Sequence, residues 1–195
     1  TRLRTVTGVQ TCALPILPFD RFVGTDVILG PEMRSTGECM GIDKDFGRAY
    51  AKSQLAASQR LPNEGTVFLS INDREKEAIV PVVKEFLELG FKVVATMGTR
   101  RFLWEQGITV DLMLKVHEGR PHILDAIKNQ QIQLIINTPI GKAAQVDDRS
   151  IRRTAISYKI PTVTTVAGAR ATVAALRALK EHTLEVSPLQ DYHSV

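Results

Sequence analysis

Cysteine is scarce in this sequence of 195 residues, which contains only Cys12 and Cys39. Two cysteines are too few for a disulfide-stapled scaffold, and they fit a reducing compartment. Neither has a second thiol nearby, so we expect no metal site of the zinc–thiolate kind. No apolar run is long enough to span a bilayer. A net charge of +4 without interleaved aromatic residues also argues against nucleic acid. We therefore expect neither a membrane nor a nucleic acid as a partner.

The common signatures of nucleotide binding and catalysis are missing as well. Neither GxGxxG nor GxxxxGKS/T occurs, so the standard dinucleotide and Walker loops are absent. His117 and His122 do not form an HExxH zinc motif, because Gly119 and Pro121 break any shared helical face. No pair of side chains suited to acid–base catalysis stands out.

The first third of the chain follows no regular pattern until a helical segment. The chain starts at Thr1, and residues 1–19 fit nothing that follows; part of them resembles translated sequencing-adapter sequence, so we expect a non-native leader. Residues 20–42 are rich in Gly, Asp and Thr, which predicts loop and short strand. Residues 43–60 have a helical pattern, and Pro62 to Gly65 then predict a domain boundary. The expected apolar stripe of this helix is formed by Phe46, Tyr50 and Leu55.

From residue 65 onward, short apolar runs alternate with helical patterns. Strands are predicted at 66–71, 91–95, 112–116, 133–136 and 160–164. Helices are predicted at 73–89, 99–107, 121–129, 147–158 and 168–180, with Pro121 in the first turn of its helix. Regular alternation with near-continuous apolar strands predicts an α/β fold: a five-stranded parallel sheet with helices on both faces.

Polar residues follow three of the predicted strands, where ligands bind in open parallel α/β folds. Two lysines, two hydroxyls and a helix N-terminus preceded by Gly98 suit a phosphate. A purely structural interpretation stays open: the threonines and Asn137 can cap or satisfy turns, and the lysines can be solvated surface charges. The candidate residues are Lys76, Thr96, Thr99, Lys115, Asn137 and Thr138.

The segment 149–180 carries seven basic residues and no acidic one. We favour a solvated basic face that partly complements helix C-termini. The alternative is a positive field over an anionic ligand or an acidic partner domain.

Four motifs in order resemble one family. GPEMRSTGECMG (30–41), KVHEGRPH (115–122), IINTPIGK (135–142) and DDRSIRRTA (147–155) closely resemble the C-terminus of the large subunit of bacterial carbamoyl-phosphate synthase. The resemblance runs from about Asp20 to the end of the chain. Cys39 stands where the family usually has an aliphatic residue, and we interpret it as a small buried apolar substitute.

The resemblance implies a division of the chain. Residues 20–42 would be the remnant of the second ATP-grasp unit, residues 43–64 a linking helix and linker, and residues 65–195 a Rossmann-like, methylglyoxal-synthase-like allosteric domain. The full cytoplasmic enzyme is an ATP-dependent ligase that makes carbamoyl phosphate from bicarbonate, glutamine-derived ammonia and two ATP. It uses Mg²⁺ or Mn²⁺, pairs with a glutaminase small subunit and feeds arginine and pyrimidine synthesis. The chain alone, without the rest of the large subunit, would be non-catalytic, with a homo-oligomer as one option.

The resemblance also implies effector residues. In this family the regulatory domain binds nucleotides such as UMP or IMP. Lys76, Thr96, Thr99 and Lys115 would contact the phosphate, and Ile151 would lie beside the ring. Asn137, Thr138 and Asp147 would contact the ribose or base. Thr164 marks a candidate ornithine region, but Val163 stands where some relatives have an Asp, which argues against ornithine control.

Two alternatives come from other functional classes. Methylglyoxal synthase shares the fold and is a lyase, but it carries a catalytic Asp directly before the Pro that follows the fourth strand. Here Thr138 precedes Pro139, so the base for proton abstraction is missing. A structural oligomerisation module is the third option, and the sequence leaves it open.

Overall fold

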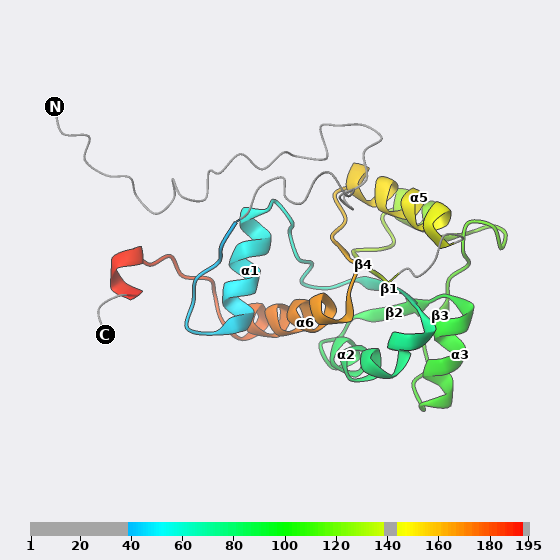
Figure 1. The fold of residues 1–195 in the computed structure, drawn as a ribbon, viewed down its shortest axis with the longest axis horizontal. Coiled ribbons are helices and arrows are strands. Elements are labelled where there is room, and N and C mark those ends of the chain that lie inside the picture. Colours follow the sequence, from blue (N-terminus) through cyan, green and yellow to red (C-terminus); the bar gives the residue numbers. More distant parts are fainter. Residues whose placement is uncertain (1–38, 139–143, 193–195) are drawn as a thin grey trace.

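The computed structural model describes residues 39–138 and 144–192 (Figure 1). Cys12, the expected leader 1–19 and nearly all of the segment 20–42 lie outside the described residues. The elements, in chain order, are α1 (Phe46–Ala56), β1 (Thr66–Ile71), the 3-10 turn η2 (Asp73–Glu75), α2 (Lys76–Glu88), β2 (Lys92–Ala95), α3 (Met97–Glu105), β3 (Asp111–Leu112), α4 (Ile123–Lys128), β4 (Leu134–Thr138), α5 (Ala144–Ser157), β5 (Thr162–Val163), α6 (Val166–Glu181) and the 3-10 turn η3 (Leu189–Tyr192).

The five strands form one parallel sheet in the order β3-β2-β1-β4-β5. Val67 at the centre of the sheet pairs with Val93 of β2 on one side and Leu134 of β4 on the other. The chain thus moves outward from β1 to β3, and then returns to the opposite side of β1. This confirms the predicted parallel α/β fold, and it places the topological switch point between β1 and β4.

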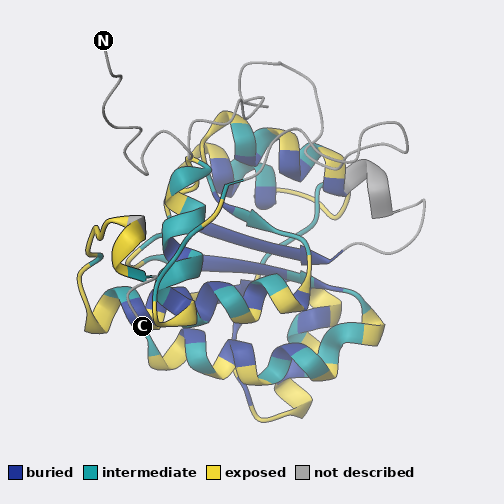
Figure 2. Cartoon of the chain, turned by 60° about the vertical axis from the view of Figure 1, so that its left-hand side comes forward, coloured by how far each residue is buried: buried dark blue, intermediate teal, exposed yellow. Residues whose placement is uncertain are grey.

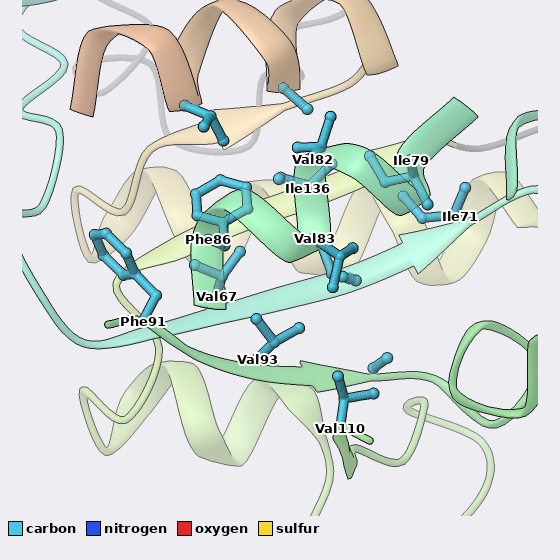
Figure 3. Packing of buried hydrophobic residues seen from close by; sticks show 14 of the residues in the cluster. Val67, Ile71, Ile79, Val82, Val83, Phe86, Phe91, Val93, Val110 and Ile136 are labelled. Atoms are coloured by element: carbon cyan, nitrogen blue, oxygen red, sulfur yellow. The ribbon is translucent and has the colours of Figure 1, made fainter. Parts of the chain in front are cut away.

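Both faces of the sheet are buried, which explains why its strands read as continuous apolar runs. Val67, Leu69 and Ile71 of β1 pack on one face together with residues of α2 and α6 (Figure 3). Phe68 points to the other face, against residues of α4 and α5. In Figure 2 the strands accordingly lie as a buried layer between helices whose outer surfaces are exposed.

Helix α1 departs from the prediction in the face that it buries. Phe46 and Leu55 of the expected stripe are 65% and 54% exposed, whereas Gly47 and Ala51 are buried. A Cβ on Gly47 would lie 2.5 Å from the carbonyl oxygen of Ala174 in α6. The helices therefore approach each other through small residues, so the prediction that Phe46, Tyr50 and Leu55 form the buried apolar stripe was wrong. The domain boundary near residue 65 stays a prediction.

Several predicted boundaries shift in the structure. The third strand was expected at 112–116 but is β3, Asp111–Leu112, an edge strand that pairs with β2 alone. The helix expected at 121–129 begins at Ile123, and His122 occupies its N-cap position. Pro121 lies before that cap, so its predicted place in the first turn was wrong.

Basic residues of α6 contact α2, which lies against it. Arg177 forms an ion pair with Glu85 at 2.9 Å, and the Lys180 ammonium donates a hydrogen bond to the carbonyl of Leu89 at the C-cap of α2. The Lys180 contact favours the interpretation that basic side chains partly complement helix C-termini, whereas Arg177 pairs with a side chain of α2. In the described part of the chain, no helix combines the length and apolar character needed to cross a membrane.

Candidate functional site

A cavity of about 550 Å³ opens at the carboxyl ends of β1, β2 and β4, beside the switch point of the sheet. Parallel strands end at a common edge, so residues far apart in sequence meet there. Seven of the nine predicted site residues line this cavity: Lys76, Thr96, Thr99, Lys115, Asn137, Thr138 and Ile151.

Two threonines form the corner between β2 and α3. Thr96 occupies the N-cap position of α3, and Thr99 lies in its first turn rather than at the predicted cap. The Thr99 hydroxyl accepts a hydrogen bond from the Ile71 backbone N–H at 3.1 Å, and the Thr96 hydroxyl donates to Thr99 at 3.3 Å. Thr99 therefore ties the start of α3 to the end of β1, which gives it a structural role. Gly98 between them lines the cavity beside the helix N-terminus, where backbone N–H groups lack intrahelical partners.

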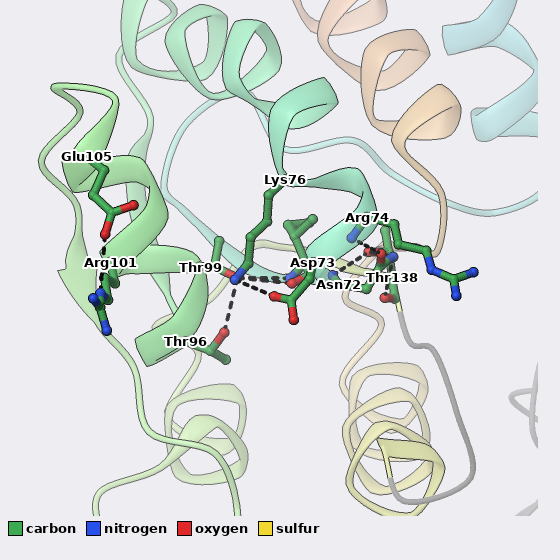
Figure 4. A network of polar contacts seen from close by, with 10 residues as sticks. Asn72, Asp73, Arg74, Lys76, Thr96, Thr99, Arg101, Glu105 and Thr138 are labelled. Atoms are coloured by element: carbon green, nitrogen blue, oxygen red, sulfur yellow. Dashed lines mark hydrogen bonds and ion pairs between the residues drawn. The ribbon is translucent and has the colours of Figure 1, made fainter.

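Lys76 begins α2 and reaches across the cavity toward α3 (Figure 4). Its side chain is 15% exposed, and its ammonium lies 2.6 Å from Oδ1 of Asp73. The ammonium lies beside Gly98, since a Cβ built there would stand in ordinary van der Waals contact, 3.5 Å from the Lys76 Nζ. The hydrogen bond from Lys76, followed by its charge and that of Lys115, holds the pKa of Asp73 below its ordinary value. Both predicted lysines thus stabilise the same carboxylate, that of Asp73.

Asn72 joins the ends of β1 and β4. Its backbone N–H donates to the Thr138 hydroxyl at 3.2 Å, and its side-chain amide donates to the Thr138 carbonyl at 3.1 Å (Figure 4). Thr138 is the last residue of β4 rather than part of a following turn. Its hydroxyl therefore positions a loop of the cavity. Sequence reasoning did not single out Asn72, although a polar residue directly after a buried strand was the available signal.

Asn137 is oriented by a carboxylate of α5. Its amide nitrogen donates to Oδ1 of Asp148 at 2.9 Å, and the two residues are only 1% and 6% exposed. Because an ionised carboxylate only accepts hydrogen bonds, this contact fixes which end of the amide faces Asp148. Asp148 was not predicted, yet it stands three positions before Ile151 and therefore shares its helix face.

The remaining two predicted residues are Asp147 and Thr164. Asp147 lies in α5, but its side chain is outside the described part of the structure. Thr164 directly follows β5 and does not line the cavity. Cys39 is half-buried, and its thiol donates to the carbonyl of Ser53, so it is less buried than expected.

The cavity has a polar, cationic end, and a few apolar side chains belong to its lining. Lys76, Lys115 and the N-terminus of α3 supply charge and directed donors, which suit an anion. Phe68 and Ile151 line the cavity as apolar surface. Within residues 39–138 and 144–192, no group of three or more His, Cys, Asp or Glu residues is placed to hold a metal ion.

The fold and this cavity define an MGS-like domain, and the family model of that description matches residues 78–164. Over 177 residues, 91% of the chain, the sequence is 66% identical to the carbamoyl phosphate synthase large chain of a Nostoc species. It is 61% identical to that of a Synechocystis species over 178 residues, and 53% identical to that of Mesorhizobium japonicum over 177 residues. The matched region covers 15–16% of these relatives. The chain thus corresponds to the C-terminal region of carbamoyl phosphate synthase large chains.

Proposed function

We propose that this chain is the allosteric region of a carbamoyl phosphate synthase large chain and that its cavity binds a nucleoside monophosphate of the UMP or IMP type. The observation that carries the proposal is the meeting of Lys76, Lys115 and the first turn of α3 at one edge of the sheet. The parent enzyme would be the glutamine-hydrolysing ligase that consumes two ATP with Mg²⁺ or Mn²⁺, in cooperation with a glutaminase subunit. The chain itself would regulate rather than catalyse.

The phosphate would bind at the cationic end. Lys76 offers a partly buried ammonium, and the backbone N–H groups at the start of α3 point along the helix axis toward the anion. The Thr96 hydroxyl can turn from Thr99 to a phosphate oxygen, because the Thr99 hydroxyl has a main-chain partner of its own. These are the groups expected at a phosphate site from the sequence.

The nucleoside would extend toward β4 and α5. Asn137, held by Asp148, presents the remaining side of its amide to a ribose or base. Ile151 is 2% exposed and would pack against the ring. Asp147 as a further ribose or base contact stays a prediction, and so does the argument from Val163 against ornithine control near Thr164.

Titration calorimetry with UMP and IMP tests this proposal. Lys76→Met removes a charged donor, and we expect affinity to fall about tenfold or more, since a hydrogen bond to a charged group is worth roughly 1.5–3 kcal/mol. Lys84→Met is the matched control, because Lys84 lies exposed on the same helix away from the cavity. Absence of binding to the unmodified chain at millimolar nucleotide would refute the proposal.

A lyase of the methylglyoxal synthase type is a poorer fit. The position before Pro139 is Thr138, whose hydroxyl accepts hydrogen bonds from Asn72 and offers no carboxylate base. We expect no methylglyoxal from dihydroxyacetone phosphate in a colorimetric assay; its formation would favour the lyase instead.

A further inference from the structure

The cationic end of the cavity already holds an anion that belongs to the chain itself. Asp73 lies in η2, between β1 and α2, and its carboxylate contacts the Lys76 ammonium at 2.6 Å. The Asp73 side chain is 94% exposed, whereas that of Lys76 is 15% exposed. The carboxylate therefore approaches the lysine from the solvent side, which is also the side from which a ligand arrives.

Asp73 differs from two other carboxylates of this region in the partner that it has. A Glu75 oxygen accepts a hydrogen bond from the Asn72 amide, and a Glu118 oxygen accepts one from the Lys115 backbone N–H. Those two stabilise the loops in which they lie. Asp73 instead pairs with the side chain that would bind the anion, and the charge of Lys115 acts on it as well.

We propose that Asp73 is a specificity-determining residue, whose carboxylate competes with the ligand for Lys76 and disfavours ligands that carry more than one phosphate group. This inference rests on the proposed function of the same cavity. A bound phosphate must share or displace the carboxylate, and the repulsion between the two grows with the negative charge of the ligand. A nucleoside triphosphate carries about twice the charge of a monophosphate, so it meets the larger penalty.

The experiment compares Asp73→Asn with the unmodified chain by calorimetry, using inorganic phosphate, UMP and UTP in buffer with a chelator and low salt. We expect the variant to bind phosphate and UMP about threefold more tightly, a size typical of an exposed ion pair. For UTP we expect the variant to bind about tenfold more tightly than the unmodified chain, because the repulsion scales with ligand charge. Since Asp73 is exposed, the gains should shrink as salt is added.

Two further variants separate the local effect from net charge. Asp111→Asn makes the same charge change at an exposed aspartate that pairs with Lys92 at 2.8 Å outside the cavity, and we expect no change in affinity. Asp73→Glu keeps the charge, and we expect it to restore the discrimination against UTP.

The outcomes distinguish this inference from the function on which it rests. Unchanged or weaker anion binding by Asp73→Asn, equal gains for UMP and UTP, or equal effects of Asp111→Asn would overturn the inference while leaving nucleotide binding intact. Tighter phosphate binding by a chain that binds no nucleotide would support competition for Lys76 and overturn the proposed function. A chain that binds none of the three anions would overturn both.

Discussion

The Thr99 hydroxyl offers a sharp test of how the cavity is held together. Thr99 is 1% exposed, and it supplies the acceptor for the backbone N–H of Ile71, the last residue of β1. In Thr99→Val a methyl group replaces the hydroxyl with nearly the same shape. The Ile71 N–H would then be buried without its acceptor.

The cost follows from the desolvation of that group. A buried donor left unsatisfied costs on the order of 1–3 kcal/mol, more than the net worth of an ordinary hydrogen bond. For a chain of this size, each kcal/mol lowers the Tm by about 2–4 °C. We therefore expect a decrease of roughly 1–3 kcal/mol in the free energy of unfolding.

Thr154→Val is the matched control, because it removes the same hydroxyl from a different setting. The Thr154 hydroxyl donates to the Ser150 carbonyl within α5 at 2.8 Å, and its loss leaves no buried donor behind. Urea unfolding followed by far-ultraviolet circular dichroism measures both variants. If Thr99→Val and Thr154→Val agreed within about 0.5 kcal/mol, which is the usual range of neutral surface changes, the reasoning would be wrong.

Two further predictions concern helix α1 and Asp43, which lies shortly before it. Gly47→Ala should destabilise the chain by about 1–3 kcal/mol despite the better helix propensity of alanine, because its Cβ meets the Ala174 carbonyl; chemical denaturation measures this, and a stabilised variant would contradict it. Asp43 has its pKa held below the ordinary 3.8, chiefly by the hydrogen bond from Lys52. A depressed carboxyl pKa stabilises the fold above the unfolded-state pKa, and the contribution is lost as pH falls through the folded-state pKa. The Tm of Asp43→Asn should therefore fall less than that of the unmodified chain when the pH is lowered through about 4 and below, and parallel melting curves would contradict this.

The order of strands and helices could be predicted from the sequence because their residue patterns are local. The strand at 66–71 is present as predicted. In the helix expected at 73–89, Ile79, Val82, Val83 and Phe86 are buried, whereas Leu87, which the helical pattern put on the same face, is 38% exposed. The face of α1 was misjudged because amphipathic pattern does not reveal whether the partner helix offers room for large side chains. Gly47 is buried there since α6 comes too close for anything larger.

The position of part of the candidate site could be predicted for the same reason. Strand ends mark one edge of a parallel sheet, so Lys76, Thr96 and Asn137 were expected near one another, and all three line the cavity. Asp148 was missed because its hydrogen bond to Asn137 joins a helix and a strand whose relative position the sequence does not state. Thr99 was expected as a cap, and its bond to Ile71 depends equally on tertiary packing.

By itself, the sequence determined the parallel α/β class and the cluster of polar groups at the strand ends, because apolar periodicity and turn residues act over a few positions. Only the tertiary structure decided which hydroxyls form hydrogen bonds with the main chain, that Asp73 contacts the lysine of the cavity, and that small residues join α1 to α6. Each of these depends on distances between side chains and backbone that meet through the fold.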